Sequence, residues 1–189
     1  AKEWHPTKNE SLSPSEITRG SHRKIWWQCK NGHEWQATVN GRTGESKGCP
    51  VCANKKIIEG YNDLKSNNPQ LAQEADGWDP SKILCGSAQL MTWKCVHGHQ
   101  WEEPVAKRSR FGTSCPYCSN RYVFTGFNDL ATLFPAIAKE ADGWDPLIVL
   151  ASSRKKLPWK CKFGHKWLSS PIARSYEGAD CPHCAGVKR

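Results

Sequence analysis

The sequence contains no long apolar segment, and acidic residues are scarce in it. Hydrophobic residues make up 38% of the chain and the mean hydropathy is −0.69. No apolar run approaches the roughly 18 residues that a membrane-spanning helix needs. The pattern of a secretory signal peptide is also missing. These absences argue against a membrane-spanning or secreted protein, and we expect a cytoplasmic, nucleoid-associated protein with no membrane partner.

One unit recurs three times, with a period of 66 residues. In the first copy Cys29 is followed by Gly32-His33 and, 20 residues after Cys29, by Cys49-Pro50-Val51-Cys52. Cys95 and Cys161 begin the second and third copies. Self-similarity at this period indicates a tandem array of like modules. The predicted domains are a first module with an N-terminal extension and two modules that each follow a helical connection: residues 1–54, 55–120 and 121–189.

Three cysteines and one histidine per copy form a complete ligand set for a tetrahedral Zn²⁺ ion. Thiolate and imidazole suit zinc, and a glycine just before each histidine favours a tight turn with positive φ. Three cysteines cannot pair with one another within one copy, which argues against a disulfide framework. The sequence therefore predicts three structural zinc ions. Their ligands are Cys29, His33, Cys49 and Cys52, then Cys95, His99, Cys115 and Cys118, then Cys161, His165, Cys181 and Cys184.

The predicted zinc sites are closed, so we expect no enzymatic activity. A catalytic zinc keeps one position open for water and usually has a carboxylate nearby as general base. Four protein ligands fill each shell here, and Glu34, the acid beside the first histidine, is replaced by Gln100 and Lys166 in the other copies. Cys85, the tenth cysteine, matches Ala151, and we interpret it as a small buried apolar residue rather than a redox group.

Alternating apolar residues on either side of the first Cys-x3-His turn predict two short strands, residues 25–29 and 35–39. The stretch 40–48, rich in Gly, Ser and Lys, is expected to be a loop. A module this small buries little apolar surface, so the metal must supply much of its folding energy. We expect a small zinc-stabilised α+β fold, made of three zinc-ribbon or treble-clef-like modules with short β-hairpins, joined by short helices.

The connections between modules belong to the repeat. Asn68 is a candidate N-cap for a helix that starts at Pro69 and ends before Gly77, and Pro135 opens the matching helix in the next connection. Gly-Trp-Asp-Pro follows both helices. We expect each helix to lay its apolar face and a tryptophan on the following zinc module.

Six of the ten tryptophans lie two residues from a predicted zinc ligand. We interpret them as core residues rather than base-stacking residues, because large aromatics bury the most area in a small module. Trp26 has no counterpart and is the tryptophan most free to act at a surface. An arginine recurs nine residues after each histidine, at Arg42, Arg108 and Arg174. It could hold the following loop through backbone carbonyls or reach a phosphate, and the sequence favours neither.

The charge balance favours an acidic partner. The chain has 27 Lys and Arg against 18 Asp and Glu, a formal net charge of +9; three zinc-loaded sites near −1 each lower it to about +6. Basic clusters lie just before or after the modules, which favours nucleic acid over an anionic membrane. The predicted nucleic-acid contacts are Arg23, Lys24, Trp26, Arg42, Lys107, Arg108, Arg110, Arg154, Lys155, Lys156 and Arg174.

The pattern Trp-x-Cys-x2-Gly-His-x-Trp, a later arginine and Cys-Pro-x-Cys, with Asn-Asp-Leu and Trp-Asp-Pro flanks, resembles a family of zinc-ribbon or treble-clef domains of unknown function. This family occurs in tandem in bacterial and large DNA virus proteins, and the resemblance covers nearly the whole chain. It implies zinc binding by the cysteines and histidines above. Some members sit beside nuclease domains of the very-short-patch-repair type, which implies a DNA-targeting role.

The sequence thus predicts a tandem zinc-finger array that binds nucleic acid, DNA before RNA, through phosphate contacts from basic loops. The first residues and residues 185–189 resemble parts of further connections, so we expect a targeting part of a larger protein. No nuclease signature is visible, so any cutting would belong to a partner enzyme or another domain of the parent protein. The alternative is a protein-interaction scaffold that presents apolar residues such as Tyr122 and Phe124.

Overall fold

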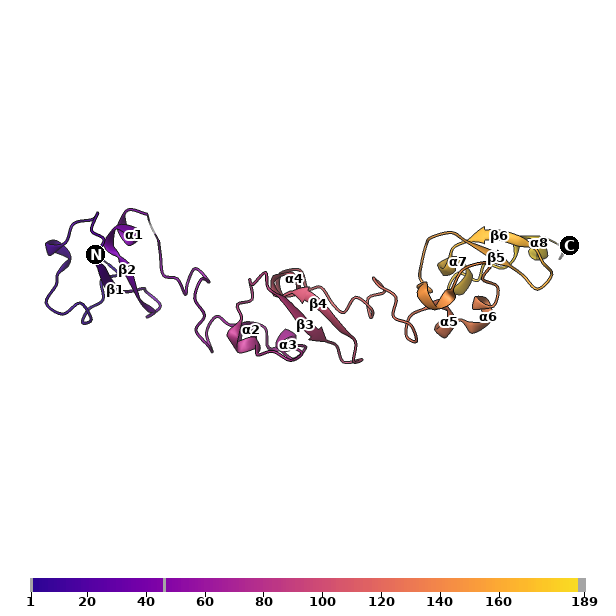
Figure 1. Cartoon of the computed structure of the whole chain (residues 1–189), viewed down its shortest axis with the longest axis horizontal. Helices are drawn as coiled ribbons and strands as arrows, with labels where there is room; N and C mark the ends of the chain where they lie inside the picture. The colour runs from indigo at the N-terminus through magenta and orange to yellow at the C-terminus, as the bar shows by residue number, and fades with distance from the viewer. Residues whose placement is uncertain (1, 46, 187–189) are drawn as a thin grey trace. The chain divides into compact units, whose positions relative to one another are not determined.

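The structure is a computed structural model that describes residues 2–45 and 47–186 (Figure 1). Residues 187–189, where we expected part of a further connection, lie outside the described residues. The chain divides into two compact units, one formed by residues 1–93 and 102–113, the other by residues 94–101 and 114–189. Within the described ranges, no helix combines the length and the apolar character that crossing a bilayer requires.

Each repeat contains one two-stranded β-hairpin, as predicted. In the first hairpin Trp27 pairs with Trp35, and in the third Trp159 pairs with Trp167. The glycine before each zinc-site histidine has a φ of +80° to +88°, a conformation that costs glycine little. The hairpin strands are β1 (Lys24–Gln28) with β2 (Glu34–Thr38), β3 (Leu90–Lys94) with β4 (Gln100–Pro104), and β5 (Leu157–Lys160) with β6 (Lys166–Ser169).

A short helix follows each hairpin, so the prediction of a loop over residues 40–48 was wrong for its first part. The Thr38 side chain accepts a hydrogen bond from the Gly41 N–H, and the Ser170 side chain accepts one from the Ala173 N–H. These are N-cap interactions, which outweigh the helix-breaking effect of glycine over one turn. The three helices are α1 (Val39–Thr43), α4 (Val105–Phe111) and α7 (Pro171–Ser175).

The connections contain the predicted helices and one more helix each. The Asn68 side chain caps α3 through the Leu71 N–H, as predicted, but α3 ends at Ala72 because Ala75 already forms a β-bridge with Trp93. The additional helices are capped by aspartates of the repeated Asn-Asp-Leu motif. The connection helices are α2 (Leu64–Asn67), α3 (Pro69–Ala72), α5 (Leu130–Leu133) and α6 (Pro135–Ala138); the remaining short helices are η1 (Pro14–Glu16), η2 (Pro80–Lys82), η3 (Pro146–Ile148) and α8 (Pro182–Ala185).

Tryptophans form the centre of each small core, as predicted. Trp93 and Trp159 are fully buried, and Trp27 is 2% exposed. Each indole N–H donates across its own hairpin, for example from Trp159 Nε1 to the Ser169 carbonyl. The tryptophan of the preceding connection packs edge-on against it, with ring centroids 5.0 Å apart for Trp78 on Trp93 and for Trp144 on Trp159. The connections therefore dock on the modules as expected.

Candidate zinc centres and basic surfaces

The first ligand set closes around one point. Its four ligand atoms lie within 4.8 Å of one another. The Cys29 and Cys52 sulfurs are 3.7 Å apart, and His33 Nδ1 is 3.4 Å from Cys29 Sγ and 3.3 Å from Cys52 Sγ. A tetrahedral zinc with ordinary bond lengths places two sulfurs about 3.8 Å apart and a sulfur and a nitrogen about 3.5 Å apart. The observed spacing therefore fits one zinc ion bound by three sulfurs and Nδ1.

The second and third sites repeat this geometry. The sulfurs of Cys95 and Cys118 are 3.8 Å apart, and those of Cys161 and Cys184 are 3.9 Å apart. A disulfide would bring two sulfurs to about 2.05 Å, and all ten cysteines are free. The prediction of three structural zinc sites in place of a disulfide framework is confirmed. The four side chains leave no vacancy in a tetrahedral shell.

The backbone of each hairpin turn stabilises the first thiolate of its site. Burial alone would raise the pKa of Cys29, but hydrogen bonds from the N–H groups of Asn31 and His33 lower the pKa of its thiol overall. The Cys161 pKa is lowered in the same way by Phe163 and His165. The positive-φ glycine between these residues aims both N–H groups at the sulfur. The turn thus prepares a zinc ligand before the metal binds.

An aromatic residue of the following connection covers the ligand histidine in the first two sites. The rings of Tyr61 and His33 have centroids 4.4 Å apart, and those of Phe127 and His99 have centroids 4.3 Å apart. Sequence comparison showed the recurrence of Gly-Tyr/Phe-Asn-Asp-Leu but not this role. In these two sites, the aromatic ring that packs against the ligand histidine therefore comes from the next connection.

The neighbouring asparagine fixes that connection to the second ligand turn. Asn62 donates to the carbonyls of Val51 and Lys56, and its Oδ1 accepts a hydrogen bond from the Ile58 N–H. Asn128 makes the equivalent bonds, including 2.9 Å to the Tyr117 carbonyl. Both asparagines are buried, and a buried amide with satisfied donors and acceptor defines a single arrangement of the chain. The hydrogen bonds of the asparagine thus fix the connection to the turn that carries the second pair of zinc ligands.

Arg108 and Arg174 are buried in the fold, which corrects their prediction as nucleic-acid contacts, whereas the contact predicted for the partly exposed Arg42 stays a prediction. Arg108 Nη1 lies 3.0 Å from a Glu74 carboxylate oxygen, and its Nε donates to the Thr113 carbonyl just before the second ligand pair. Its guanidinium lies 4.6 Å from the Trp93 ring centroid. With 3% of its side chain exposed, Arg108 has no surface to offer a phosphate.

Arg174 repeats this arrangement, and Arg42 repeats its pairing with a glutamate. Arg174 pairs with Glu140, donates to the Ala179 carbonyl and lies over the Trp159 ring. Arg42 pairs with Glu3, with 2.6 Å between Nε and the carboxylate. Of the two roles left open for these arginines, holding the loop before the second ligand pair is the one that the structure shows for Arg108 and Arg174.

The sequence family described as "Probable Treble clef zinc finger domain" matches the chain at residues 1–55, 70–121 and 138–187. The chain belongs to this family. No curated protein is significantly similar to the chain. Each match contains one of the three Cys3His clusters. The molecule is therefore a tandem array of three zinc-stabilised treble-clef modules.

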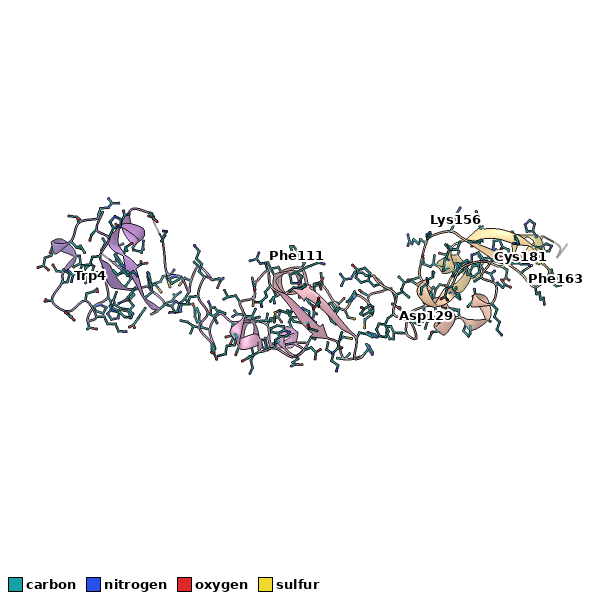
Figure 2. All side chains as sticks on the ribbon, viewed as in Figure 1. Trp4, Phe111, Asp129, Lys156, Phe163 and Cys181 are labelled. Carbon is teal, nitrogen blue, oxygen red and sulfur yellow. The ribbon has the colours of Figure 1, made fainter. Side chains whose placement is uncertain are left out.

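Each treble-clef module also has a region without zinc ligands, which we call the basic end. It consists of the short helix after the hairpin and the segment that leads into the first strand and includes the first residue of that strand: residues 19–24 with 39–43, 85–90 with 105–111, and 151–157 with 171–175. A hydroxyl on each helix donates to that segment, from Thr43 to the Arg19 carbonyl at 2.9 Å and from Ser175 to the Ala151 carbonyl at 2.9 Å. Figure 2 shows Lys156 and Cys181 at opposite ends of the third module.

The seven remaining predicted cations all lie at the basic ends. All are exposed, and they occupy the segment that leads into the first strand in the first and third modules and α4 in the second: Arg23 and Lys24, Arg154, Lys155 and Lys156, and Lys107 and Arg110. Lys107 lies 2.7 Å from the Glu103 carboxylate and keeps half of its side chain exposed. The second cluster was expected on a loop and instead lies on a helix.

Trp26 is less free than expected. The Lys8 ammonium lies 4.6 Å from its ring centroid, and Asn9 hydrogen-bonds to both its backbone N–H and its carbonyl. These contacts come from the N-terminal extension of the first module, which folds over the hairpin. Trp26 is half-buried, so its predicted nucleic-acid contact remains a prediction.

Proposed function

We propose that this array binds nucleic acid, DNA in the first place, through the basic ends of its three modules. One observation carries the proposal: all three modules place exposed lysines or arginines on the same helix-and-loop scaffold. The first and third modules use equivalent positions before the first strand, Arg23 with Lys155 and Lys24 with Lys156, and the second module uses the helix. Cations that serve only solubility could lie anywhere on the surface of a module, so solubility does not explain why they lie in the same region in all three modules. A set of charges at a fixed place on each module suits repeated contact with phosphates.

The electrostatics of the fold support the same conclusion. The inward arginines are neutralised by glutamates within the modules, whereas the described residues supply no carboxylate to Arg110, Arg154 or Lys156. Phe111, 78% exposed, adjoins Arg110 on α4, and an exposed aromatic ring beside a cation suits stacking on a base. The basic end of the second module therefore combines charge with a stacking surface.

We propose a binding role and no catalytic one. Four protein ligands complete each zinc shell, so no coordination position is available to activate water. The zinc ions would instead hold the basic ends rigid. In a longer parent protein or a complex, such an array would deliver an attached enzyme to DNA.

The test is fluorescence anisotropy of a labelled DNA duplex with the zinc-loaded chain, titrated from low to moderate salt. We expect log Kd to depend linearly on log salt, with a slope of about 0.9 per phosphate contacted. Replacing the three cations of the third basic end by glutamine should weaken binding about tenfold or more at 0.1 M salt and reduce the slope by about 2 to 3. The variant is Arg154→Gln/Lys155→Gln/Lys156→Gln.

A matched control removes the same charge from the same module at a different place, by replacing three exposed lysines with glutamine: Lys139, Lys160 and Lys162. Equal losses in the two variants would show that only net charge matters and would contradict the basic-end proposal. No binding by the unmodified chain at low salt, or binding indifferent to salt, would refute nucleic-acid binding altogether.

A protein-interaction scaffold is the second candidate, because apolar side chains remain exposed. Tyr122 is 65% exposed, and Val96 and Phe163, on the zinc turns, are 95% and 69% exposed. Phe124 is less available, since its ring centroid lies 4.6 Å from that of His99. Retained partner binding by the charge-neutralised variant, with loss on Val96→Ser or Phe163→Ser, would favour the scaffold.

A further inference from the structure

Two grooves occupy equivalent places in the repeat, and neither contains a zinc ligand. The first groove lies between two segments, residues 53–57 and residues 82–89. Residues 53–57 follow the second pair of ligands of the first zinc site, and residues 82–89 lead into β3. The second groove lies between residues 121–123 and residues 148–157, 66 residues further on. Each reaches the basic end of its module, where Arg110 lines the first groove and Lys155 the second.

The two grooves share their chemistry. None of the described residues that line either groove is acidic. Apolar residues line both grooves, Ile83 and Leu84 in the first and Val149 and Leu150 in the second. Cations line them too, although Lys82 of the first groove also pairs with Glu59 outside it. An anion with an apolar body fits such a groove.

The size of each groove limits the ligand. The cavity volumes are about 610 Å³ and about 350 Å³, within the range of small-molecule sites and too small for a helix of a partner protein. A nucleotide unit has an anionic phosphate and a largely apolar face on its sugar and base. The grooves therefore match one nucleotide each, and not a folded partner.

We propose that each groove holds one nucleotide of a bound nucleic-acid strand, with its phosphate against a lining cation and its sugar and base against the apolar lining residues. This inference rests on the proposed nucleic-acid binding and assigns it two specific subsites. In the first, Arg110 contacts the phosphate; in the second, Lys155 does. The remaining cations of the basic ends act on neighbouring phosphates.

Gly86 offers a way to fill the first groove without changing any charge. It lines the groove and its φ is not in the left-handed region, so a side chain is allowed there. A Cβ on Gly86 would lie 2.8 Å from Arg110 Nη2, the far end of a flexible side chain. Gly86→Leu should therefore displace the guanidinium and occupy the groove while the module stays folded.

The experiment measures DNA binding by the zinc-loaded Gly86→Leu chain in the anisotropy assay. We expect about a tenfold loss of affinity at 0.1 M salt and a salt slope reduced by about 1, with unchanged zinc content and thermal unfolding. Gly48→Leu is the matched control, because Gly48 lies outside the basic ends, is exposed, has no left-handed φ and has open space around it. It should bind like the unmodified chain.

Cys85 gives a second readout that needs no substitution. Its thiol lines the first groove, so bound DNA should slow its alkylation by iodoacetamide, measured by mass spectrometry of the peptide that contains it. If the unmodified chain binds DNA but Gly86→Leu binds equally well and Cys85 alkylation is unchanged, the groove assignment is wrong while the basic-end proposal stands. If the unmodified chain binds no DNA, both fail.

Discussion

The zinc end and the basic end of each module differ in how they repeat. At the zinc end the same residue types recur at the same spacing three times, from the Cys-x3-His turn to the Cys-Pro-x-Cys turn. At the basic end the scaffold recurs, because a helix after the hairpin is tied to a loop by a hydroxyl in each module. The cations precede the first strand in the first and third modules, but they lie on the helix in the second.

This difference follows from what each end has to satisfy. A metal shell accepts four donors at fixed distances, so a displaced ligand loses the site. A phosphate backbone accepts a cation from several positions, because Coulomb attraction depends weakly on direction. The zinc end therefore carries the fold, and the basic end is where the modules can differ in what they bind.

Removing the zinc ions should produce the largest loss of folding stability. We expect three zinc ions per chain by elemental analysis, and loss of the near-ultraviolet circular dichroism of the buried tryptophans on chelation, because structural zinc contributes on the order of 10 kcal/mol or more to folding. A ligand variant such as Cys115→Ser should release one zinc and abolish order in the second module.

The comparison predicts that no single change at a basic end approaches this effect. The variant Arg154→Gln/Lys155→Gln/Lys156→Gln is the control and should keep three zinc ions and the tryptophan signal. A chelated chain with native circular dichroism would contradict the assignment of folding energy to the zinc end.

The second-largest effect is expected at the inward arginines. Arg174→Met should destabilise the third module by about 3 kcal/mol, because it leaves the Glu140 carboxylate without its partner and the Ala179 carbonyl without a donor. Glu140→Gln should cost less, since 29% of that side chain is exposed and water can screen its loss.

The decisive measurement compares thermal unfolding with DNA affinity at a temperature where the variants remain folded. Arg174→Met should lower Tm and leave the DNA affinity and its salt slope unchanged. A lower salt slope without a change in Tm would return this arginine to the phosphate-binding set.

Residue type and spacing were enough to predict the zinc ligands, because few other roles need Cys3His at these intervals. They also predicted the tryptophan cores and the Asn68 cap, which depend on local sequence. They could not assign Arg108, since its partner Glu74 lies 34 residues away and a guanidinium binds a carboxylate or a phosphate equally well. The helix α1 was missed because its turn contains Gly41, and a glycine-rich stretch resembles a loop.

The N-terminal extension shows the same limit. By residue type, Trp4 could correspond to Trp78, or Glu3 to Glu74. The structure places Trp4 in a β-bridge to Trp27, where Ala75 bridges Trp93 in the next repeat. Glu3 and Glu74 then occupy one position, and both pair with the recurrent arginine. The contacts decide between the two registers, because residue type fits either one.

A third and smaller loss of stability is expected when the aspartate N-caps of the connection helices are replaced. Asp129 is fully buried and accepts hydrogen bonds from the Gly126 and Thr132 N–H groups. Asp129→Ala should destabilise by about 1 to 2 kcal/mol. Asp129→Asn, which can still accept one bond, should cost less.

The caps also predict a pH dependence. Burial alone would raise the pKa of Asp129, but hydrogen bonds from Thr132 and Gly126 lower it overall. The stability it contributes is therefore complete above the ordinary carboxyl range near pH 4 and is lost as pH falls below it. Unfolding curves of the unmodified chain and of Asp129→Ala should converge in acid; curves that stay parallel would contradict this assignment.

The smallest effect concerns a pair that changes sign between the outer modules. In the first module His5 lies 2.8 Å from Glu34, and Lys8 also pairs with that carboxylate; in the third, Asp142 lies 2.8 Å from Lys166. The positions correspond, since the backbone N–H groups of His5 and Asp142 bond to equivalent carbonyls, those of Trp26 and Pro158. One contact is thus kept with its charges exchanged.

The version in the first module should respond to acid. Hydrogen bonds from Lys8 and then His5 lower the pKa of Glu34, so the contribution of Glu34 is present above the ordinary carboxyl range and declines as pH falls through its lowered folded value. Glu34→Gln should shift Tm only slightly, because exposed ion pairs are screened by water. Lys166→Gln should behave alike at neutral pH. If either variant lowered Tm as much as Arg174→Met does, this contact would be essential for the fold, as the zinc ligands are.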